Sequence, residues 1–367
     1  MGTSCLGGRR IAPRVAGQQV SVNVALPLAL AVFTASLWLT GRLRAYALAR
    51  DLLDVPNVRS SHHVPTPRGG GVAIVVATLL ALPVLGALGT MTWPAVCGLG
   101  GGGALVALVG FADDHWDIAP RWRLLGHFTA ALWLLWWLGG LPPLRMFGDL
   151  FDLGWFGHVI AAVYLVWLLN LTNFMDGIDG LAAVEVITVS ASVACLYPVS
   201  APGRADWLGP LVLAAATLGF LVWNWPPAKI FMGDSGSGFV GLMVGALSIQ
   251  AAWVAPPLFW GWLILLGVFV VDATVTLLRR IVRKERVYEA HRSHAYQHAA
   301  LRWGSHLPVT LAVAAINVCW LLPIALVVLS GWIEGLVGVI LAYAPLAAAV
   351  LWLEGGRPSA GMSRTSS

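Results

Sequence analysis

Long apolar runs are the feature of this sequence that most restricts its fold. A helix needs about 20 apolar residues to cross the hydrocarbon core of a bilayer. Only 11% of the 367 residues are charged, against about 25% in soluble domains, so a large soluble domain is excluded. We predict an all-α integral membrane protein with eleven transmembrane helices, or ten because the fourth run is short, near residues 22–40, 69–90, 94–112, 124–139, 157–173, 181–199, 208–225, 236–256, 258–278, 307–330 and 332–353.

Two short tails flank this domain. Residues 1–21 are rich in Gly, Arg and Ser without periodicity, and we interpret them as a flexible tail before an uncleaved span. Residues 22–353 form the predicted transmembrane domain, and residues 354–367 form a C-terminal tail without a recognisable signal. The loop 141–157 alternates around Gly and Asp, which is compatible with a small hairpin. The four cysteines lie far apart without metal-binding or redox spacing, so we interpret them as buried apolar side chains.

Basic residues indicate the topology. When the loops are assigned alternately to the two sides of the membrane, one side receives 17 of the 22 Lys and Arg residues. By the positive-inside rule this side is cytoplasmic. Three N-terminal arginines fall on the other side, which leaves the orientation of the first span open. We therefore attribute the net charge of +5 to topology and expect no nucleic-acid partner.

The stretch NLTNFMDGIDGLA, which begins at Asn170, interrupts two apolar runs with charge. Charge at the end of a membrane helix is rare unless it faces a polar site. Asp176 and Asp179 are three residues apart, and Asn173 precedes Asp176 by the same step, so a helix would place them on one face. The two glycines leave room for a phosphate to approach the backbone. We interpret the stretch as an active-site wall; the alternative is a capped turn between helices.

A second acidic cluster ends the third apolar run and consists of Asp113, Asp114 and Asp117. Carboxylates this close repel one another unless a cation lies among them. Oxygen ligands favour Mg²⁺, which commonly binds one or two carboxylates together with substrate phosphates. Arg121 and Arg123 follow the cluster, so the alternative is simple neutralisation of the acids at the membrane surface.

Asp234 stands in a Gly- and Ser-rich turn directly before another apolar run. The backbone amides of Ser235–Ser237 are expected to be exposed at a helix start, where they favour anions. Together with Lys229 they suit a metal ion and its diphosphate. The alternative is that Asp234 only caps the helix.

Two basic loops on the predicted cytoplasmic side supply anion-binding groups. Arg68 precedes three glycines at the mouth of a span, which suits a phosphate contact at a helix start; the alternative is a basic loop that only enforces topology. The longest loop contains the HRSH cluster of His291, Arg292 and His294. No cysteine lies nearby, and the carboxylates elsewhere prefer a harder ion than zinc, so we predict phosphate or sugar recognition. Asp272, in the preceding span, faces the site or pairs with a basic neighbour.

The ordered motifs RSSH with PTPRGGG, GFADDHWD, NFMDGIDGLA, FMGDSGS and HRSHAYQ resemble those of the polyprenyl-phosphate N-acetylhexosamine-1-phosphate transferases, glycosyltransferase family 4. The resemblance covers about Asp54 to Gln297. It implies a Mg²⁺-dependent enzyme of the bacterial inner membrane whose active site faces the cytoplasm. In such enzymes a lipid phosphate, usually undecaprenyl phosphate, attacks the β-phosphorus of a UDP-N-acetyl sugar. UMP leaves, and a sugar diphospholipid remains in the membrane.

The resemblance also assigns roles to individual positions. Asp113 and Asp114 match an acidic pair credited with activating the lipid phosphate or with binding metal. Asp176 and Asp179 match carboxylates near the nucleotide and metal, and Asp234 matches a direct Mg²⁺ ligand. The predicted catalytic residues are therefore Asp113, Asp114, Asp176 and Asp179, the predicted metal ligands are Asp234, Asp114 and Asp176, and the predicted substrate-binding residues are Arg68, Asn173, Asp117, His291, Arg292 and His294.

The HRSHAYQ loop distinguishes members of the family. The phospho-N-acetylmuramoyl-pentapeptide transferase of peptidoglycan synthesis would have adjacent histidines here, so the sequence resembles instead the branch that initiates O-antigen and related glycans. That branch uses donors such as UDP-linked N-acetylfucosamine, N-acetylquinovosamine or N-acetylglucosamine. The peptidoglycan enzyme is the alternative. The expected partners are the polyprenyl phosphate, the UDP-sugar, the membrane and a second copy of the chain.

Two further considerations limit the mechanism and the class. A phosphate monoester has a second pKa near 6, so the lipid phosphate hardly needs a base, and we expect Asp113 and Asp114 mainly to position metal or lipid phosphate. A transporter is the alternative from another class, because intramembrane acids often line ion paths. Transporter sites lie near mid-span, whereas these acids cluster at span ends, which favours the enzyme.

Overall fold

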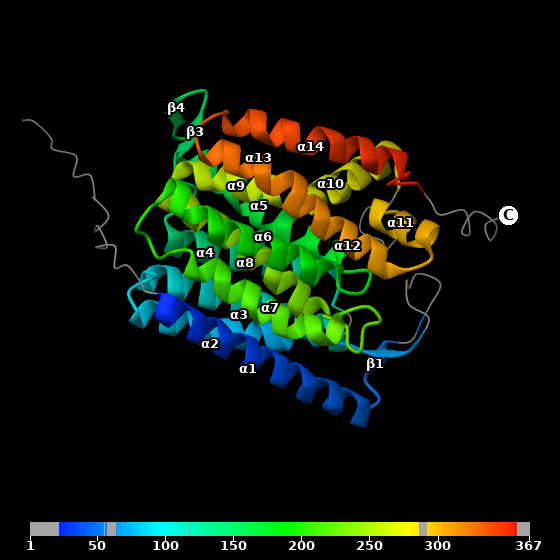
Figure 1. Ribbon diagram of the computed structural model, residues 1–367. Coiled ribbons are helices and arrows are strands. Elements are labelled where there is room, and N and C mark those ends of the chain that lie inside the picture. The colour runs from blue at the N-terminus through cyan, green and yellow to red at the C-terminus, as the bar shows by residue number, and fades with distance from the viewer. Residues whose placement is uncertain (1–21, 55, 57–63, 117, 286–291, 358–367) are drawn as a thin grey trace, which may run out of the picture.

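The computed structural model describes residues 22–54, 56, 64–116, 118–285 and 292–357. It is a bundle of long helices that run side by side between two ends (Figure 1). In chain order the described helices are α1 (Val22–Ala49), α2 (Val72–Ala87), α3 (Trp93–Trp116), α4 (Pro120–Leu138), α5 (Gly154–Met175), α6 (Leu181–Ser200), α7 (Leu208–Asn224), α8 (Asp234–Val254), α9 (Pro256–Leu265), α10 (Gly267–Val282), α11 (Ala295–Trp303), α12 (His306–Ile316), η1 (Asn317–Leu321, a π-helix), α13 (Leu322–Leu329) and α14 (Gly335–Trp352).

The all-α membrane class is supported, but the predicted count of eleven spans is not confirmed. Each predicted apolar run overlaps a helix or a broken helix. Within the described residues, seven helices are long and apolar enough to cross a membrane, where α12 to α13 counts as one. The pair α9 and α10, bent by 65°, would be an eighth. The apolar helices α2 and α7 are shorter, with 16 and 17 residues.

Helix α8 is the centre of the bundle. In its most apolar window 83% of the residues are buried, against 22% for the peripheral α1. Glycines allow neighbouring helices to approach it closely: a Cβ at Gly241 would lie 2.7 Å from the carbonyl oxygen of Leu168 in α5. A Cβ at Gly110 in α3 would lie 2.5 Å from the backbone nitrogen of Ser235. The C-terminal ends of α3 and α5 therefore meet the N-terminal end of α8.

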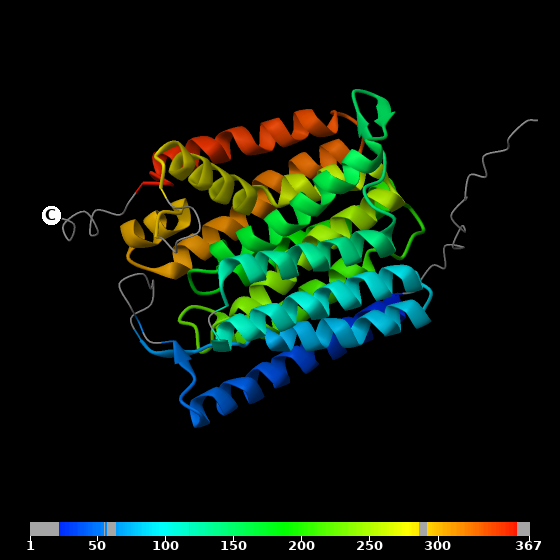
Figure 2. The ribbon, with the colours of Figure 1, turned by 180° about the vertical axis from the view of Figure 1, so that it is seen from behind.

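Two short hairpins mark the two ends of the bundle. Strands β1 (Leu53–Asp54) and β2 (Thr66–Pro67) pair antiparallel near the start of α8. Strands β3 (Leu144–Met146) and β4 (Asp149–Phe151) also pair antiparallel, which confirms the predicted hairpin, and they lie at the opposite end (Figure 1). We call the end that carries β1 and β2 the site end, and the end that carries β3 and β4 the hairpin end. Helix α11 lies at the site end in both views (Figures 1 and 2).

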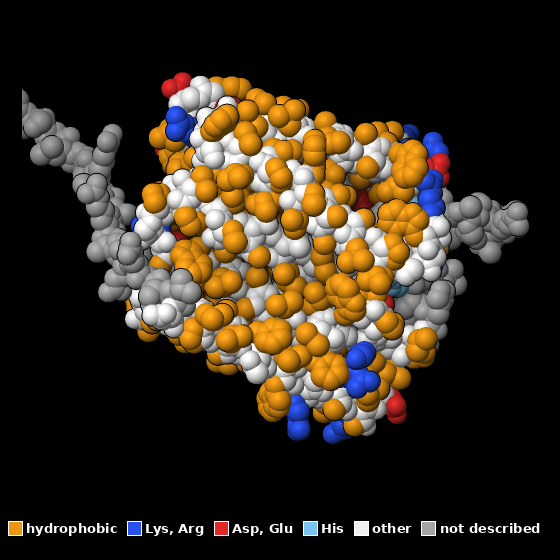
Figure 3. Space-filling view, in the orientation of Figure 1, with side chains coloured by type: hydrophobic (Ala, Val, Ile, Leu, Met, Phe, Trp, Pro, Cys, Tyr) orange, Lys and Arg blue, Asp and Glu red, His pale blue; other side chains and the backbone are white. Residues whose placement is uncertain are grey.

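The sides of the bundle are apolar. Figure 3 shows hydrophobic side chains over the sides of the visible face, with basic and acidic side chains mostly near the helix ends. Large side chains such as Leu80, Trp136 and Trp155 are exposed by 68%, 83% and 76%. Exposed apolar surface of this extent would be unfavourable in water but suits contact with lipid.

Candidate active site

The C-terminal end of α3 carries Asp113 and Asp114, and their carboxylates have different partners. Asp113 accepts hydrogen bonds from the guanidinium of Arg123 and, at 2.9 Å, from the backbone N–H of Ile118. Asp114 accepts hydrogen bonds from the first two backbone N–H groups of α8, at 3.3 and 3.4 Å. A carboxylate here satisfies donors that a helix leaves unpaired and complements the helix dipole. Asp114 therefore caps α8 from a position 120 residues earlier.

This arrangement corrects the interpretation of the turn at Asp234. Asp114 accepts from the amide of Ser235, and the amides of Gly236 and Ser237 both donate to the carbonyl of Gly233, at 3.1 and 3.0 Å. The predicted row of exposed amides is therefore already used within the protein. The alternative that Asp234 is only an N-cap is also wrong, because Gly233 occupies the cap position.

The side chain of Asp234 lies among charged and polar groups of the other helices. Its carboxylate is 3.6 Å from the guanidinium of Arg123. The side chains of Asp113 and Asn173 lie within hydrogen-bonding reach of it. Arg123 thus contacts two acids, one from α3 and one from α8, and Asn173 brings the end of α5 to the same place.

Arg68 joins this acidic group from the segment that follows β2. Backbone hydrogen bonds between residues 67–71 and 231–232 hold the segment beside the start of α8, at 2.8 to 2.9 Å. The Arg68 guanidinium donates to the carbonyl of Asp114 at 2.5 Å and lies 3.9 Å from its carboxylate. A cavity of about 370 Å³ opens here and is lined by Arg68, Asp113, Asp114, His115 and Asp234.

Asp176 connects the acids of α3 and α8 with the loop between α5 and α6. Burial raises the pKa of the Asp176 carboxyl well above its usual range, and the nearby carboxylates of Asp234, Asp179 and Asp114 raise it further. The five predicted acids that the structure describes, Asp113, Asp114, Asp176, Asp179 and Asp234, therefore form one group. The expectation that Asn173, Asp176 and Asp179 share a helical face is wrong, because α5 ends at residue 175 and α6 begins at residue 181.

Asp179 is held by two other parts of the chain. Its carboxylate accepts a hydrogen bond from the backbone N–H of Ala228 at 3.1 Å. Its own backbone N–H donates to Nδ1 of His306 at 3.3 Å, and its carboxylate lies 3.3 Å from the same nitrogen. The hydroxyl of Thr310 donates to its carbonyl at 2.9 Å. The start of α12 thus fixes the acidic loop.

The two glycines of this loop do not leave room for a phosphate, contrary to the sequence-based expectation. A Cβ at Gly177 would lie 2.1 Å from the hydroxyl oxygen of Tyr296, which donates to the carbonyl of Phe174 at 3.0 Å. Gly180 has a φ of +74°, and its N–H donates to the side chain of Asn224 at 2.9 Å. Both glycines are explained by packing and backbone conformation.

The predicted HRSH cluster is only partly described. His291 and Asp117 lie outside the described residues. His294 is buried at the start of α11, with Nδ1 3.4 Å from the carboxylate of Asp272. The same carboxylate accepts the backbone N–H groups of Ala295 and Tyr296 at 2.9 and 3.0 Å. Asp272 therefore pairs with the start of α11, and His294 contributes to that junction.

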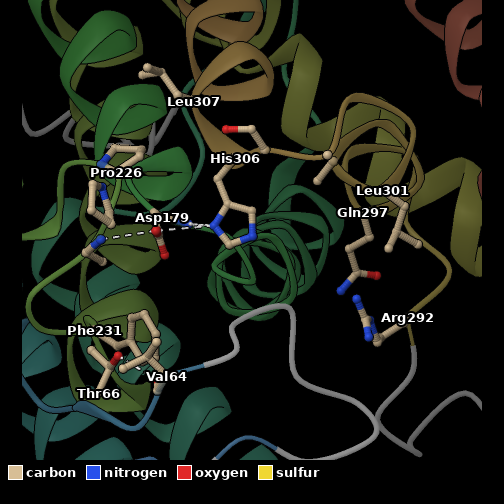
Figure 4. Close-up of a pocket in the computed structure, with 15 residues that line it drawn as sticks. Val64, Thr66, Asp179, Pro226, Phe231, Arg292, Gln297, Leu301, His306 and Leu307 are labelled. Carbon is tan, nitrogen blue, oxygen red and sulfur yellow. Dashed lines mark hydrogen bonds and ion pairs between the residues drawn. The ribbon is translucent and has the colours of Figure 1, made fainter.

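A second, larger cavity of about 630 Å³ lies between β2, the loop before α8, α11 and the start of α12. Figure 4 shows Phe231, Thr66 and Val64 on one side and Arg292 and Gln297 on the other, with Asp179 and His306 between them. Apolar walls with a few polar groups are typical of sites for small molecules. The described residues that line it are Val64, Thr66, Asp179, Pro226, Pro227, Ala228, Phe231, Arg292, Gln297, Ala300, Leu301, Gly304, Ser305, His306 and Leu307.

His306 is the functional candidate that sequence reasoning missed. Nδ1 lies 3.3 Å from both the backbone nitrogen and the carboxylate of Asp179, so Asp179 engages this nitrogen of the ring. In Figure 4 the second ring nitrogen, Nε2, points away from Asp179, into the space in front of Gln297. The available signal was weak: a lone histidine at the start of an apolar run, 127 residues from its partner.

The acids fit Mg²⁺ by the chemistry of their donors. Among the described residues, no three His, Cys, Asp or Glu side chains are arranged to hold an ion by themselves. Asp114, Asp176 and Asp234 nevertheless offer hard oxygen donors within one group. Mg²⁺ usually takes one or two carboxylates, with water and substrate phosphates completing its shell. The arrangement fits an ion that binds together with a phosphate substrate.

Comparison with known proteins identifies the same region. The family model described as glycosyl transferase family 4 matches residues 96–252, which include all five acids. A probable undecaprenyl-phosphate N-acetylglucosaminyl 1-phosphate transferase of Bacillus subtilis is 29% identical over 287 residues, 76% of this chain and 78% of its own. A decaprenyl-phosphate N-acetylglucosaminephosphotransferase of Mycolicibacterium smegmatis is 35% identical over 292 residues, 71% of each chain. A phospho-N-acetylmuramoyl-pentapeptide-transferase of Oceanobacillus iheyensis is 28% identical over 290 residues, 73% of this chain and 84% of its own.

Proposed function

Because this chain belongs to glycosyl transferase family 4, we propose that it transfers N-acetylglucosamine 1-phosphate from UDP-N-acetylglucosamine to a polyprenyl phosphate. The observation that carries this proposal is the convergence of five aspartates from α3, the loop after α5 and the start of α8 beside two cavities. Acids gathered in this way, with arginines beside them, suit phosphoryl transfer between two anionic substrates.

In the proposed reaction an oxygen of the lipid phosphate forms a bond to the β-phosphorus of the UDP-sugar. The bond from that phosphorus to the oxygen bridging the α-phosphorus breaks, and UMP leaves with the electron pair. Mg²⁺, when bound, would neutralise and align the phosphates. Arg68, which is 47% exposed on the smaller cavity, is suited to meet the anionic lipid phosphate.

The contacts of the acidic pair support a positioning role. Asp113 already accepts two hydrogen bonds, one of them charge-assisted from Arg123. Asp114 is engaged with the start of α8. A general base needs an accessible acceptor and a proton to remove, whereas a lipid phosphate with a second pKa near 6 is mostly dianionic at neutral pH. Both acids therefore suit alignment better than deprotonation.

We place the uridine of the donor in the larger cavity. Phe231 is suited to stack on a base, and the side chain of Gln297 and Nε2 of His306 are suited to hydrogen bonds with its polar edge. Arg292 at the same wall is suited to the diphosphate. Asp176 and Asp179 connect this cavity with the smaller one, so the donor diphosphate would lie between the nucleoside and the lipid phosphate.

The donor and the setting follow from the relatives and the topology. Two of the relatives have N-acetylglucosamine in their names, and the third has N-acetylmuramoyl-pentapeptide. The HRSH loop favours the first kind. The apolar flanks and the 17 basic residues on one side support a bacterial inner-membrane enzyme with a cytoplasmic site. The product would initiate a cell-envelope glycan such as an O-antigen.

The test is a transfer assay on the full chain purified in detergent. Undecaprenyl and decaprenyl phosphate are offered with UDP-N-acetylglucosamine, UDP-N-acetylfucosamine, UDP-N-acetylquinovosamine or UDP-N-acetylmuramoyl-pentapeptide, with Mg²⁺ or with a chelator. We expect release of UMP and a new diphospholipid with UDP-N-acetylglucosamine, lost on chelation and restored by Mg²⁺. Turnover with the pentapeptide donor alone would establish the alternative. Silence with every donor, while another family member works in the assay, would overturn the proposal.

A further inference from the structure

The residues directly after α14 form a turn that contacts α10. In this turn, Glu354–Arg357, which we call the C-terminal clasp, the carbonyl of Gly355 accepts a hydrogen bond from the guanidinium of Arg279 at 2.6 Å. The carbonyl of Gly356 accepts one from the guanidinium of Arg283 at 2.6 Å. Figures 1 and 2 show the end of α14 beside α10 and α11. Two arginines therefore anchor the clasp to the end of α10.

The clasp also holds the chain that leads into α11. The backbone N–H of Gly356 donates to the carbonyl of Ser293 at 2.5 Å. Nε2 of His298 lies 3.1 Å from the carbonyl of Arg357. A Cβ at Gly355 would lie 3.3 Å from the Cβ of Ala295. The clasp thus contacts the residues immediately before and after the start of α11, as well as its first turn.

The backbone of the clasp requires glycine. Gly356 has a φ of +79°, which L-residues with a Cβ rarely adopt. A Cβ at this position would also lie 2.9 Å from the Cβ of Arg279 and 3.2 Å from the carbonyl oxygen of Thr276. Glycine at position 356 is therefore required for this close approach.

The segment that the clasp holds forms one wall of the larger cavity. Arg292 precedes Ser293, and Gln297 lies one turn into α11; both line the cavity. Tyr296, between them, donates to the carbonyl of Phe174 two residues before Asp176. A shift of the start of α11 would therefore move two cavity side chains and loosen the contact with the acidic loop.

We propose that the C-terminal clasp is a positioning element for the donor nucleotide. It holds Arg292 and Gln297 at the wall where we place the UDP-sugar. It acts on the donor rather than on the lipid, because these two residues line the larger cavity and are not among the described residues that line the smaller one. This inference rests on the proposed function for the identity of the ligand.

A matched pair of glycine substitutions tests the clasp. Gly356→Ala introduces a side chain where φ is +79° and neighbours are close, whereas Gly331→Ala does so where φ is +78° and no atom lies within 4 Å. We expect Gly356→Ala to raise the KM for the UDP-sugar about tenfold, the effect of losing one or two hydrogen bonds. In Gly356→Ala, the KM for the lipid phosphate and kcat should stay within about twofold of the values of the unchanged protein. Gly331→Ala should change neither KM value nor kcat.

Truncations provide a second test, and one of its two readouts, hydrogen exchange, does not depend on turnover. A chain ending at Leu353 lacks the clasp, and a chain ending at Arg357 retains it. We expect the shorter chain to show faster amide hydrogen exchange in α11 and the same rise in donor KM, while the longer chain matches the full protein. Arg283→Gln should also raise the donor KM, whereas Arg283→Lys, which keeps the charge, should leave it near the value of the full protein.

The outcomes separate the two proposals. If the full chain shows no transfer with any donor, the proposed function fails, and hydrogen exchange in α11 still decides whether the clasp orders that helix. If the chain that ends at Leu353 showed the same hydrogen exchange in α11 and the same donor KM as the full protein, the proposed role of the clasp would be overturned. An equal rise in donor and acceptor KM would overturn it as well, because that result indicates a general structural role.

Discussion

The two ends of the bundle satisfy their acidic side chains in different ways. At the hairpin end, Asp152, Asp206 and Glu334 each accept a hydrogen bond from a group two residues away. At the site end, Asp114 and Asp179 have partners 120 and 127 residues away. The acids of the first arrangement each have a partner close in sequence, and Glu334 also accepts the backbone N–H of Phe147 at 3.4 Å. The second arrangement gathers acids from three parts of the chain.

Gathering like charges is unfavourable for stability. The raised pKa of Asp176 shows that burial and three neighbouring carboxylates disfavour its charged form. The hairpin end shows that this chain can place acids without such crowding. Stability therefore does not explain the site end, whereas the proposed binding of a cation and of phosphates would explain it. Three substitutions break or sharpen this comparison.

The largest effect is expected from Asp176→Asn. An amide cannot take on the charge that burial and the neighbouring carboxylates disfavour, so the Tm of the metal-free protein should not fall, while kcat should fall about 10³-fold. The matched variant is Asp206→Asn at the hairpin end, which loses the ion pair with Arg204 at 2.8 Å. It should lower the Tm by about 1–2 °C and leave kcat unchanged. Thermal unfolding gives the Tm and steady-state kinetics give kcat for both variants. An Asp176→Asn variant that kept its kcat but had a lower Tm would contradict the comparison.

A smaller effect is expected from Asp113→Asn, and its dependence on pH is the informative result. We expect kcat to fall about 10²-fold, and by the same factor at pH 6.5 and at pH 8.5. The reason is that the lipid phosphate loses its second proton near pH 6 and needs no protein base to do so. Asp149→Asn, an exposed acid at the hairpin end, serves as the control. Recovery of most of the activity at the higher pH would assign Asp113 the role of a base.

The smallest effect is expected from His306→Ala. Loss of one hydrogen bond to the nucleotide should raise the donor KM about fivefold, with kcat nearly unchanged. His158 at the hairpin end is a close match, since its Nδ1 also accepts a backbone N–H, from Leu141 at 3.4 Å. His158→Ala should leave both KM values unchanged. If the two variants changed the donor KM equally, the proposed contact of His306 with the nucleotide would be wrong.

The helices and their common functional end could be predicted from the sequence. Apolar length alone located the helices, because the bilayer sets a minimum run. Basic loops and span-end acids indicated one end of the bundle, and the acids of α3, α5 and α8 do meet there. The number of spans was less predictable, because helices such as α2 and α4 are short or carry charge at their ends.

Contacts between distant residues could not be predicted. Gly177 looked like space for a phosphate because nothing nearby in sequence indicates that Tyr296 fills it. The amides at the start of α8 looked exposed because their acceptor, Asp114, lies 120 residues earlier. His306 and Gly356 stood alone in sequence, without a motif. Each of these features depends on which helices are neighbours, and periodicity carries no such information.

The glycines between α5 and α8 have a consequence for ion selection. They set the distance between the two helices inside the bundle; α5 ends directly before Asp176, and α8 begins at Asp234. Mg²⁺ binds oxygen at about 2.1 Å and Ca²⁺ at about 2.3–2.6 Å, so a few tenths of an ångström separate their preferred sites. For an ion held by both carboxylates, a methyl group at Gly241 would widen the gap and shift the preference towards the larger cation. Discrimination between cations would then be set partly in the lipid-embedded core, far from any phosphate.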